Sequence, residues 1–142
     1  MLKKVLGLGV LVLVGLFVLI QLVPFGRNRA SPPVAQEPAW DSPETRALAK
    51  RACFDCHSNE TVWPWYSNIA PVSWLVARDV TEGRDAMNFS DWGQTAQRGQ
   101  KVARQVQRGA MPPSFYPPMH PTAQLTADER DQLIAGLQKS LP

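Results

Sequence analysis

The stretch Cys53-Phe54-Asp55-Cys56-His57 decides the fold expected for this 142-residue chain. Two cysteines separated by two residues and followed directly by a histidine form the attachment signature of a c-type haem. Two thiols that add to the two vinyl groups of one porphyrin must lie a short, fixed distance apart on one backbone segment. The histidine after the second cysteine is then held below the iron as an axial ligand. The motif therefore predicts one haem c, bound covalently through Cys53 and Cys56, with His57 on the iron.

Three other interpretations of the motif fit the sequence less well. A thioredoxin-like redox pair requires a βαβ pattern beside the two cysteines, and the sequence shows none. A structural zinc site requires four ligands, which would use both cysteines and both histidines of the chain, His120 included, at an unusually wide separation. A disulfide between Cys53 and Cys56 would close a very small loop and leave His57 unexplained.

The N-terminal segment, residues 1–26, is expected to be a transmembrane signal anchor. Lys3 and Lys4 precede an apolar run over residues 5–25, and a helix that crosses the hydrocarbon layer needs about 20 residues. A cleavable signal peptide has a shorter apolar region of about 7–15 residues and a small-residue cleavage site. Residues 25–29 make a poor cleavage site, so we expect the anchor to stay uncleaved.

The charges around this run leave its orientation open, because the two lysines favour a cytoplasmic N-terminus and Arg27 and Arg29 on the other flank oppose it. In bacteria, haem is attached covalently outside the cytoplasmic membrane. The haem motif therefore favours a single-pass inner-membrane protein whose C-terminal part faces the periplasm.

The net charge of +3 does not indicate nucleic-acid binding. Four of the 15 basic residues and one of the 12 acidic residues precede Trp40, which leaves equal numbers in the rest of the chain. A basic stripe with interleaved aromatic residues, the usual footprint of a nucleic-acid partner, is missing from the sequence.

Residues 27–39 are expected to form a Pro-rich linker. Pro32, Pro33 and Pro38 favour extended backbone, and at about 3.1 Å per residue the segment would span about 40 Å. The remaining residues, 40–142, are expected to form the haem-binding domain. The class is all-α, a small c-type cytochrome-like domain of short helices around one covalent haem.

Caps, prolines and apolar periodicity predict four helices in this domain. The first is opened by Ser42 and Pro43, runs towards Cys53 and carries the haem motif at its C-terminal end. The second is opened by Pro71 and Ser73, contains Trp74, Leu75 and Val80, and ends near Gly83.

The third helix is capped by Ser90 and ended by Gly109, and its apolar stripe consists of Trp92, Ala96, Gly99, Val102 or Ala103, and Val106. The fourth begins with a capping box from Thr126 to Glu129 and has an apolar face of Leu133, Ile134, Leu137 and Leu141.

A haem with one histidine ligand leaves the sixth position of the iron open. Met111 lies between the helix stop at Gly109 and two prolines that fix an extended loop, so its thioether can be presented rigidly across the porphyrin from His57. His120 is the alternative ligand, and Met87 and Met119 are weaker candidates. A methionine at any of these positions otherwise serves as a core residue.

The aromatic run Trp63-Pro64-Trp65-Tyr66 follows the motif closely. Trp63 and Tyr66 are candidate residues of the haem-pocket wall, where an indole N–H and a phenol O–H would reach a propionate. Ordinary core packing is the alternative for both rings. Arg78 and Arg84 are candidate propionate partners, although arginines on such helices are usually solvated.

Several unusual strings occur in a fixed order from about Trp40 to the end of the chain. They are Cys53 to Thr61, Trp63-Pro64-Trp65-Tyr66, Ala70-Pro71-Val72-Ser73-Trp74-Leu75, Asp79-Val80, Glu82-Gly83-Arg84, Asn88-Phe89-Ser90, Gly109, Met111-Pro112-Pro113, Tyr116, His120-Pro121, Leu125-Thr126 and Glu129. In these strings the chain resembles the bacterial haem-binding domain family. That family is similar to class I c-type cytochromes in its attachment motif and in a late Met-Pro-Pro, which implies Met111 as the distal ligand. The resemblance implies haem binding and names no reaction.

The function expected from the sequence is that of a membrane-anchored, periplasmic monohaem cytochrome that passes single electrons to a protein partner and is not an enzyme. His/Met ligation suits this role because it raises the reduction potential relative to two histidines. The alternative is a haem-based sensor or small-ligand-binding module with a displaceable sixth ligand. Peroxidase chemistry comes third, because it needs an open iron and a distal acid–base residue, for which His120 is the one obvious candidate.

Overall fold

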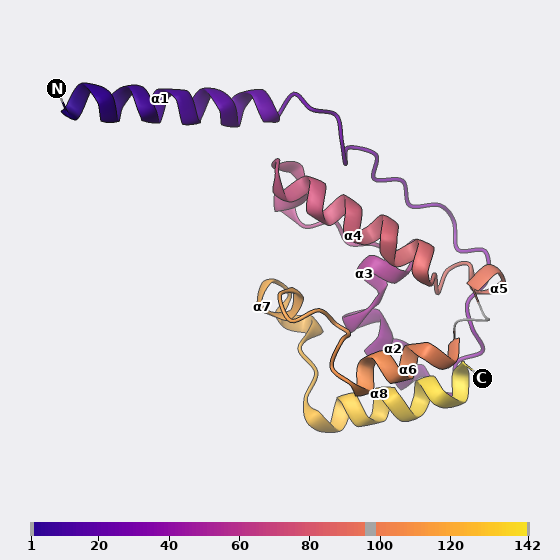
Figure 1. Cartoon of the computed structure of the whole chain (residues 1–142). Coiled ribbons are helices and arrows are strands. Elements are labelled where there is room, and N and C mark those ends of the chain that lie inside the picture. The colour runs from indigo at the N-terminus through magenta and orange to yellow at the C-terminus, as the bar shows by residue number, and fades with distance from the viewer. Residues whose placement is uncertain (1, 96–98, 142) are drawn as a thin grey trace. The chain divides into compact units, whose positions relative to one another are not determined.

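The computed structural model describes residues 2–95 and 99–141, which form a series of helices (Figure 1). The α-helices are α1 (Leu2–Ile20), α2 (Pro43–Ala52), α3 (Phe54–His57), α4 (Val72–Ala86), α5 (Trp92–Thr95), α6 (Gly99–Gln107), α7 (Tyr116–Met119) and α8 (Ala127–Ser140), and two short 3-10 helices are η1 (Trp65–Asn68) and η3 (Pro121–Ala123). Within the described ranges there is no β-strand, and one isolated bridge joins Gln36 to Asp91. The all-α class is confirmed.

The chain divides into two compact units. The first consists of residues 1–30 and 63–79, and so contains α1, η1 and the first half of α4. The second consists of residues 31–62 and 80–142 and contains the haem motif together with the remaining helices.

In the first unit, α1 is apolar after Lys3 and Lys4 and is long enough to cross a membrane. At 1.5 Å per residue its 19 residues span about 28 Å. The helix ends at Ile20, earlier than the apolar run over residues 5–25 indicated. Two causes explain this difference, one local and one that involves a distant part of the chain. Pro24 has no backbone N–H to donate, and the side-chain amide of Gln21 binds the backbone of Ala70, accepting from its N–H (2.9 Å) and donating to its carbonyl (3.0 Å).

The linker expected over residues 27–39 is not a free spacer. At its start, Arg29 binds the side chain of Asn68 within the first unit. Further on, the N–H groups of Ala35 and Gln36 both donate to the carbonyl of Ser90 in the second unit (2.8 and 3.1 Å). Backbone hydrogen bonds thus hold the later part of the segment against the second unit, while the length that the linker spans stays a prediction.

The core of the second unit lies between α2, α6 and α8, with α6 packed along α8 (Figure 1). It is made of apolar side chains that come from every part of this unit: Leu48, Ala49, Phe54, Met87, Phe89, Trp92, Ala103, Val106, Leu133, Leu137 and Leu141. The start of α8 is the expected capping box, in which the Thr126 hydroxyl accepts from the Glu129 N–H and the Glu129 carboxylate accepts from the Thr126 N–H. This prediction is confirmed.

The other helix boundaries confirm some expectations and correct others. Ser42 caps α2 through the Thr45 N–H, as expected, but α2 ends at Ala52, so the motif lies on the separate short helix α3. The helix opened near Pro71 does not stop at Gly83 and runs on to Ala86. The stripe expected after Ser90 falls on α5 and α6, and its Ala96 lies outside the described residues.

Gly109 ends α6 as predicted. Its φ is +72°, a left-handed conformation that glycine adopts readily and other residues do not. The Ala110 N–H donates to the Gln105 carbonyl and the Gly109 N–H to the Val106 carbonyl, both at 3.0 Å. This pair of bonds is a Schellman motif, which satisfies the last carbonyls of the helix and directs the chain into the segment that carries Met111.

Candidate haem-binding site

The attachment motif lies where α2 ends and α3 begins. Cys53 follows α2, and its N–H still donates to the Ala49 carbonyl (2.8 Å), while its own carbonyl accepts from the His57 N–H (2.9 Å) and opens α3. Cys56 and His57 thus belong to a single helical turn that starts at Cys53. This turn keeps the two thiols and the imidazole on one short, rigid piece of backbone, as attachment to one porphyrin requires.

Phe54, the first residue between the cysteines, fastens the motif to the core. Its side chain is 1% exposed, and its ring stacks on Phe89 with 5.4 Å between centroids. Trp40 packs on the same Phe89 ring at 5.2 Å. Burial of an aromatic side chain is among the larger single contributions to stability, so Phe54 holds the backbone of the motif against the core.

His57 is oriented by the backbone of the region around the end of α4. Its Nδ1 lies 2.9 Å from the carbonyl oxygen of Gly83 and 3.1 Å from that of Met87. Because both partners are acceptors, Nδ1 must carry the proton, and the lone pair of the neutral ring is on Nε2. Metal-bound histidines generally make this second hydrogen bond, which fixes the tautomer and the ring plane.

Burial lowers the pKa of His57 below its ordinary value, although the hydrogen bonds to the Met87 and Gly83 carbonyls act in the opposite direction. The ring is therefore neutral at neutral pH, which is the protonation state that an iron ligand needs.

Gly83 allows α4 to approach the motif this closely. A Cβ at this position would lie 2.4 Å from the carbonyl oxygen of Cys56 and 3.0 Å from its carbonyl carbon and Cβ. Real Cβ atoms do not make contacts this short, so a side chain at position 83 would push the helix away from the motif. The same residue supplies one of the two acceptors of His57. The sequence pattern indicated a helix end near Gly83 and gave no sign of this role.

Asp55, the second residue between the cysteines, connects the motif to two neighbouring segments. One carboxylate oxygen accepts from the Val62 N–H at 2.9 Å. The other accepts from the Tyr116 hydroxyl at 2.5 Å and lies 3.9 Å from Nδ1 of His120. The rings of Tyr116 and His120 stack, with 4.0 Å between centroids. His120 is thus brought next to the motif through Asp55, a link that spacing in the sequence could not show.

The cysteines are both free thiols. Burial, and to a smaller extent the neighbouring Cys56, raises the pKa of Cys53 to about 12. A nucleophilic redox cysteine requires a lowered pKa, so the thioredoxin-like interpretation gains no support here. Within the described residues no group of three or more His, Cys, Asp or Glu side chains is placed to hold a metal ion, and the four-ligand zinc arrangement is not formed.

The candidates for the sixth ligand are placed differently from one another. Met87 belongs to the core cluster, where packing explains its side chain. Met111 is 37% exposed and Met119 is 60% exposed. Met111 as the axial partner of His57 stays a prediction, with His120 as the alternative.

The candidate pocket-wall residues Trp63 and Tyr66 belong to the first unit, whereas the motif belongs to the second; their role in a haem pocket stays a prediction. The indole N–H of Trp63 is buried and has no hydrogen-bond partner among the described residues, which leaves a donor for a bound group. Arg84 donates to the Ser58 carbonyl (2.8 Å) and to the Thr61 hydroxyl (2.9 Å), so it supports the segment after the motif. The role of Arg78 towards a propionate stays a prediction.

These features fit a haem. Cys53 and Cys56 are thiols on one turn, and His57 is a buried neutral imidazole with Nδ1 protonated and Nε2 left to bind the iron. When bound, haem supplies an iron that can change between the ferric and ferrous states. The chain supplies the orientation of the proximal ring, through Gly83 and Met87, and the position of the motif, through Phe54 and Asp55.

The fold and the site define a helical protein with a single haem-binding motif. Residues 15–139 match the haem-binding domain family, and the chain belongs to that family. No curated protein and no solved structure matches the chain.

Proposed function

We propose that the protein is a membrane-anchored monohaem c-type cytochrome that passes single electrons on the periplasmic side of the inner membrane. Haem is held covalently by Cys53 and Cys56 and axially by His57 and Met111. The redox partner is another protein. The electron carrier needs no substrate-binding or acid–base group.

The observation that supports this proposal is the double acceptor at Nδ1 of His57. Two backbone carbonyls at 2.9 and 3.1 Å hold the ring in one tautomer and one plane, and the motif backbone is fastened by the 1%-exposed Phe54. A ligand that is fixed in this way changes little between oxidation states. Small rearrangement is what one-electron transfer requires, and axial ligand identity with its hydrogen bonding tunes the haem potential.

The membrane anchor is supported by α1, which is apolar and about 28 Å long, close to the thickness of the hydrocarbon layer. The periplasmic location follows from the covalent chemistry, because attachment takes place outside the cytoplasm. Protease treatment of spheroplasts tests it: the haem-bearing fragment is expected to be cleaved in intact spheroplasts, and protection of that fragment would place the domain in the cytoplasm.

Covalent attachment is tested by mass spectrometry of the denatured chain. The wild type is expected to carry the mass of one haem, and the Cys53→Ala, Cys56→Ala variant to carry none. A wild-type chain that loses its haem on denaturation would contradict the c-type assignment while leaving haem binding intact.

The sixth ligand is tested by absorption spectra of both oxidation states, with and without carbon monoxide, for the wild type, Met111→Ala and His120→Ala. Electron transfer predicts a low-spin wild type that is indifferent to carbon monoxide and a Met111→Ala variant that binds it. An unchanged spectrum in Met111→Ala would remove Met111 from the iron.

The alternative function is a haem-based sensor or small-ligand-binding module with a displaceable sixth ligand. It predicts that the wild type itself binds carbon monoxide in the ferrous state.

A further inference from the structure

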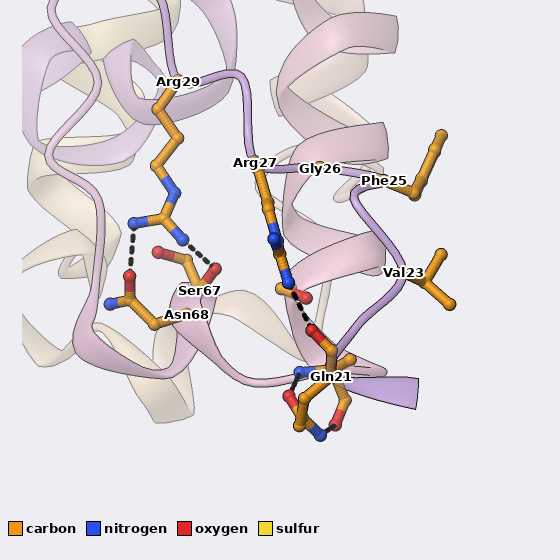
Figure 2. A pocket seen from close by; sticks show the side chains of 10 residues that line it. Gln21, Val23, Phe25, Gly26, Arg27, Arg29, Ser67 and Asn68 are labelled. Carbon is orange, nitrogen blue, oxygen red and sulfur yellow. Dashed lines mark hydrogen bonds between the residues drawn. The ribbon is translucent and has the colours of Figure 1, made fainter. Parts of the chain in front are cut away.

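A pocket of the first unit lies at the end of α1 (Figure 2). It is enclosed by the chain that follows the helix, by η1 and by the start of α4. Two of the residues that line it are arginines, Arg27 and Arg29, and none of them is acidic. The rest are small, amide or apolar residues. The pocket therefore carries an uncompensated positive charge next to an apolar helix.

The side chains of Arg27 and Arg29 extend from the backbone in the same direction, and each donates hydrogen bonds to neighbouring groups of the pocket (Figure 2). Arg29 donates to the Asn68 side chain at 2.6 Å and to the Ser67 carbonyl, and its guanidinium lies 5.7 Å from the ring centre of Trp63. The Nε–H of Arg29 is buried without a partner among the described residues. A buried, unpartnered donor of a charged group is costly, and an anionic ligand would satisfy it.

Arg27 also retains hydrogen-bonding capacity. Its side chain donates to the carbonyl of Gln21 (Figure 2), which uses one of the five N–H donors of a guanidinium. The planar fork of arginine matches the oxygens of a phosphate group, which makes arginine the preferred residue for bidentate phosphate recognition.

The pocket is rigidly built. Gln21 binds both the N–H and the carbonyl of Ala70, which fixes the end of α1 to the loop before α4. Gly26 has a φ of +75°, and a Cβ there would lie 2.9 Å from the Cβ of Ala77 and 3.0 Å from the carbonyl oxygen of Ser73. Only glycine allows the turn before Arg27 to lie this close to α4, so the backbone that carries the two arginines is fixed in place.

The same unit exposes large apolar side chains, and one of them, Phe25, lines the pocket. Phe25 is 58% exposed, Trp65 is 74% exposed and Leu75 is 57% exposed. Tryptophan and other aromatic residues are enriched at the membrane–water interface. A ligand that combines a phosphate with hydrocarbon fits a positive pocket with an apolar surround better than a free phosphate does.

We propose that this pocket binds the headgroup of an anionic phospholipid, with Arg27 and Arg29 donating to its phosphodiester. The inference rests on the proposed insertion of α1 in the membrane, since a helix about 28 Å long places residues 21–29 at headgroup level. Basic pockets next to transmembrane helices recognise lipid headgroups in this manner.

Native mass spectrometry of the detergent-solubilised, haem-loaded full chain tests the proposal. Phosphatidylglycerol is the probe, phosphatidylcholine the zwitterionic comparison and inorganic phosphate the soluble competitor. Each arginine near an anionic surface strengthens binding about fivefold, so Arg27→Gln, Arg29→Gln is expected to weaken phosphatidylglycerol binding roughly thirtyfold. The matched control is Lys3→Gln, Lys4→Gln, which removes the same charge from the other end of α1 and is expected to bind as the wild type does.

Two further variants separate a lost contact from a damaged fold, because Arg29 also supports residues 67–68. Arg27→Gln alone is expected to weaken binding about fivefold. Asn68→Ala removes a partner of Arg29 but leaves both charges, and is expected to retain the lipid. An unchanged haem spectrum and unfolding temperature in each variant show that the fold is intact.

Three outcomes would overturn the lipid site. The folded Arg27→Gln, Arg29→Gln variant could retain phosphatidylglycerol as well as the wild type does, or the wild type could retain phosphatidylcholine equally well. Excess inorganic phosphate could also displace the lipid, which would make the pocket a site for a free anion. Extraction of the wild-type chain from membranes by alkaline carbonate would instead refute the anchor, so the two failures are distinguishable.

Discussion

Substitution of Gly83 by alanine tests how the haem motif is positioned. The new methyl group would lie 2.4 Å from the Cys56 carbonyl oxygen, whereas ordinary contact begins at 3.4 Å, so α4 or the motif must move by about 1 Å. Overpacking costs about 1–3 kcal/mol, and the upper value applies because the obstacle is backbone. Alanine regains about 1 kcal/mol of helix propensity, while a weakened His57 bond loses about 1 kcal/mol. The expected net loss of stability is about 3 kcal/mol.

The assay is guanidinium unfolding of the haem-loaded full chain in detergent, followed by circular dichroism, together with the absorption spectrum of the folded protein. Gly136→Ala is the matched control. Its methyl group would lie 2.1 Å from the hydroxyl oxygen of Thr45, in the contact between α2 and α8 and away from the motif. Both variants are expected to be less stable, but only Gly83→Ala is expected to change the haem spectrum. A Gly83→Ala protein within about 0.5 kcal/mol of the wild type, with an unaltered spectrum, would refute the close approach of α4.

Three further predictions concern other contacts of the second unit. Tyr116→Phe keeps the ring but removes the hydrogen bond to Asp55, and is expected to lower the free energy of unfolding by about 2 kcal/mol, measured by the same titration. Gly109→Ala places a side chain at φ +72°, where its methyl group would meet the end of the Arg130 side chain at 3.9 Å, an ordinary contact distance. Only backbone strain of about 1–2 kcal/mol is therefore expected; a larger loss would indicate a clash.

The hydrogen bond from Arg51, with that from the Thr126 N–H, lowers the pKa of Glu129 from 4.5 to about 2. The ionised Glu129 therefore stabilises the fold fully above about pH 5, and this contribution is lost as the pH falls from about 5 to about 2. The difference in unfolding temperature between wild type and Glu129→Gln should close between pH 5 and pH 2; a difference that is independent of pH would contradict this assignment.

The features that the sequence predicted correctly depend on neighbouring residues. The capping box of Thr126 and Glu129, the cap at Ser42 and the stop at Gly109 each involve groups a few residues apart. Such local hydrogen bonds act wherever the segment occurs, so the pattern is sufficient to predict them. The haem motif is local in the same way, since Cys53, Cys56 and His57 lie on one turn. The family match supports haem binding, while the roles of the three residues stay predictions.

The features that the sequence did not reveal depend on residues far apart in the chain. A glycine near the end of an amphipathic segment usually marks a helix end, yet Gly83 lies inside α4 because its missing side chain makes room for Cys56. In the apolar run over residues 5–25, Pro24 is a local signal for a helix end, but it does not place that end as early as Ile20. The earlier end depends on Gln21, whose partner is the backbone of Ala70.

The two residues between the cysteines show why attachment and positioning are separate properties of this motif. The chemistry of haem attachment constrains only the cysteines and the histidine, and any residues of suitable size satisfy it. In this chain Phe54 is buried in the core, and Asp55 binds Val62 and Tyr116. These contacts fix the backbone of the motif, while the carbonyl groups of Gly83 and Met87 fix the ring of His57. The segment that carries Tyr116 also carries His120, and Met111 follows directly after the Schellman motif at Gly109. The contact between Asp55 and Tyr116 therefore couples the attachment motif to the part of the chain that holds both candidates for the sixth ligand, so a change at position 55 should alter the sixth position of the iron without touching either cysteine.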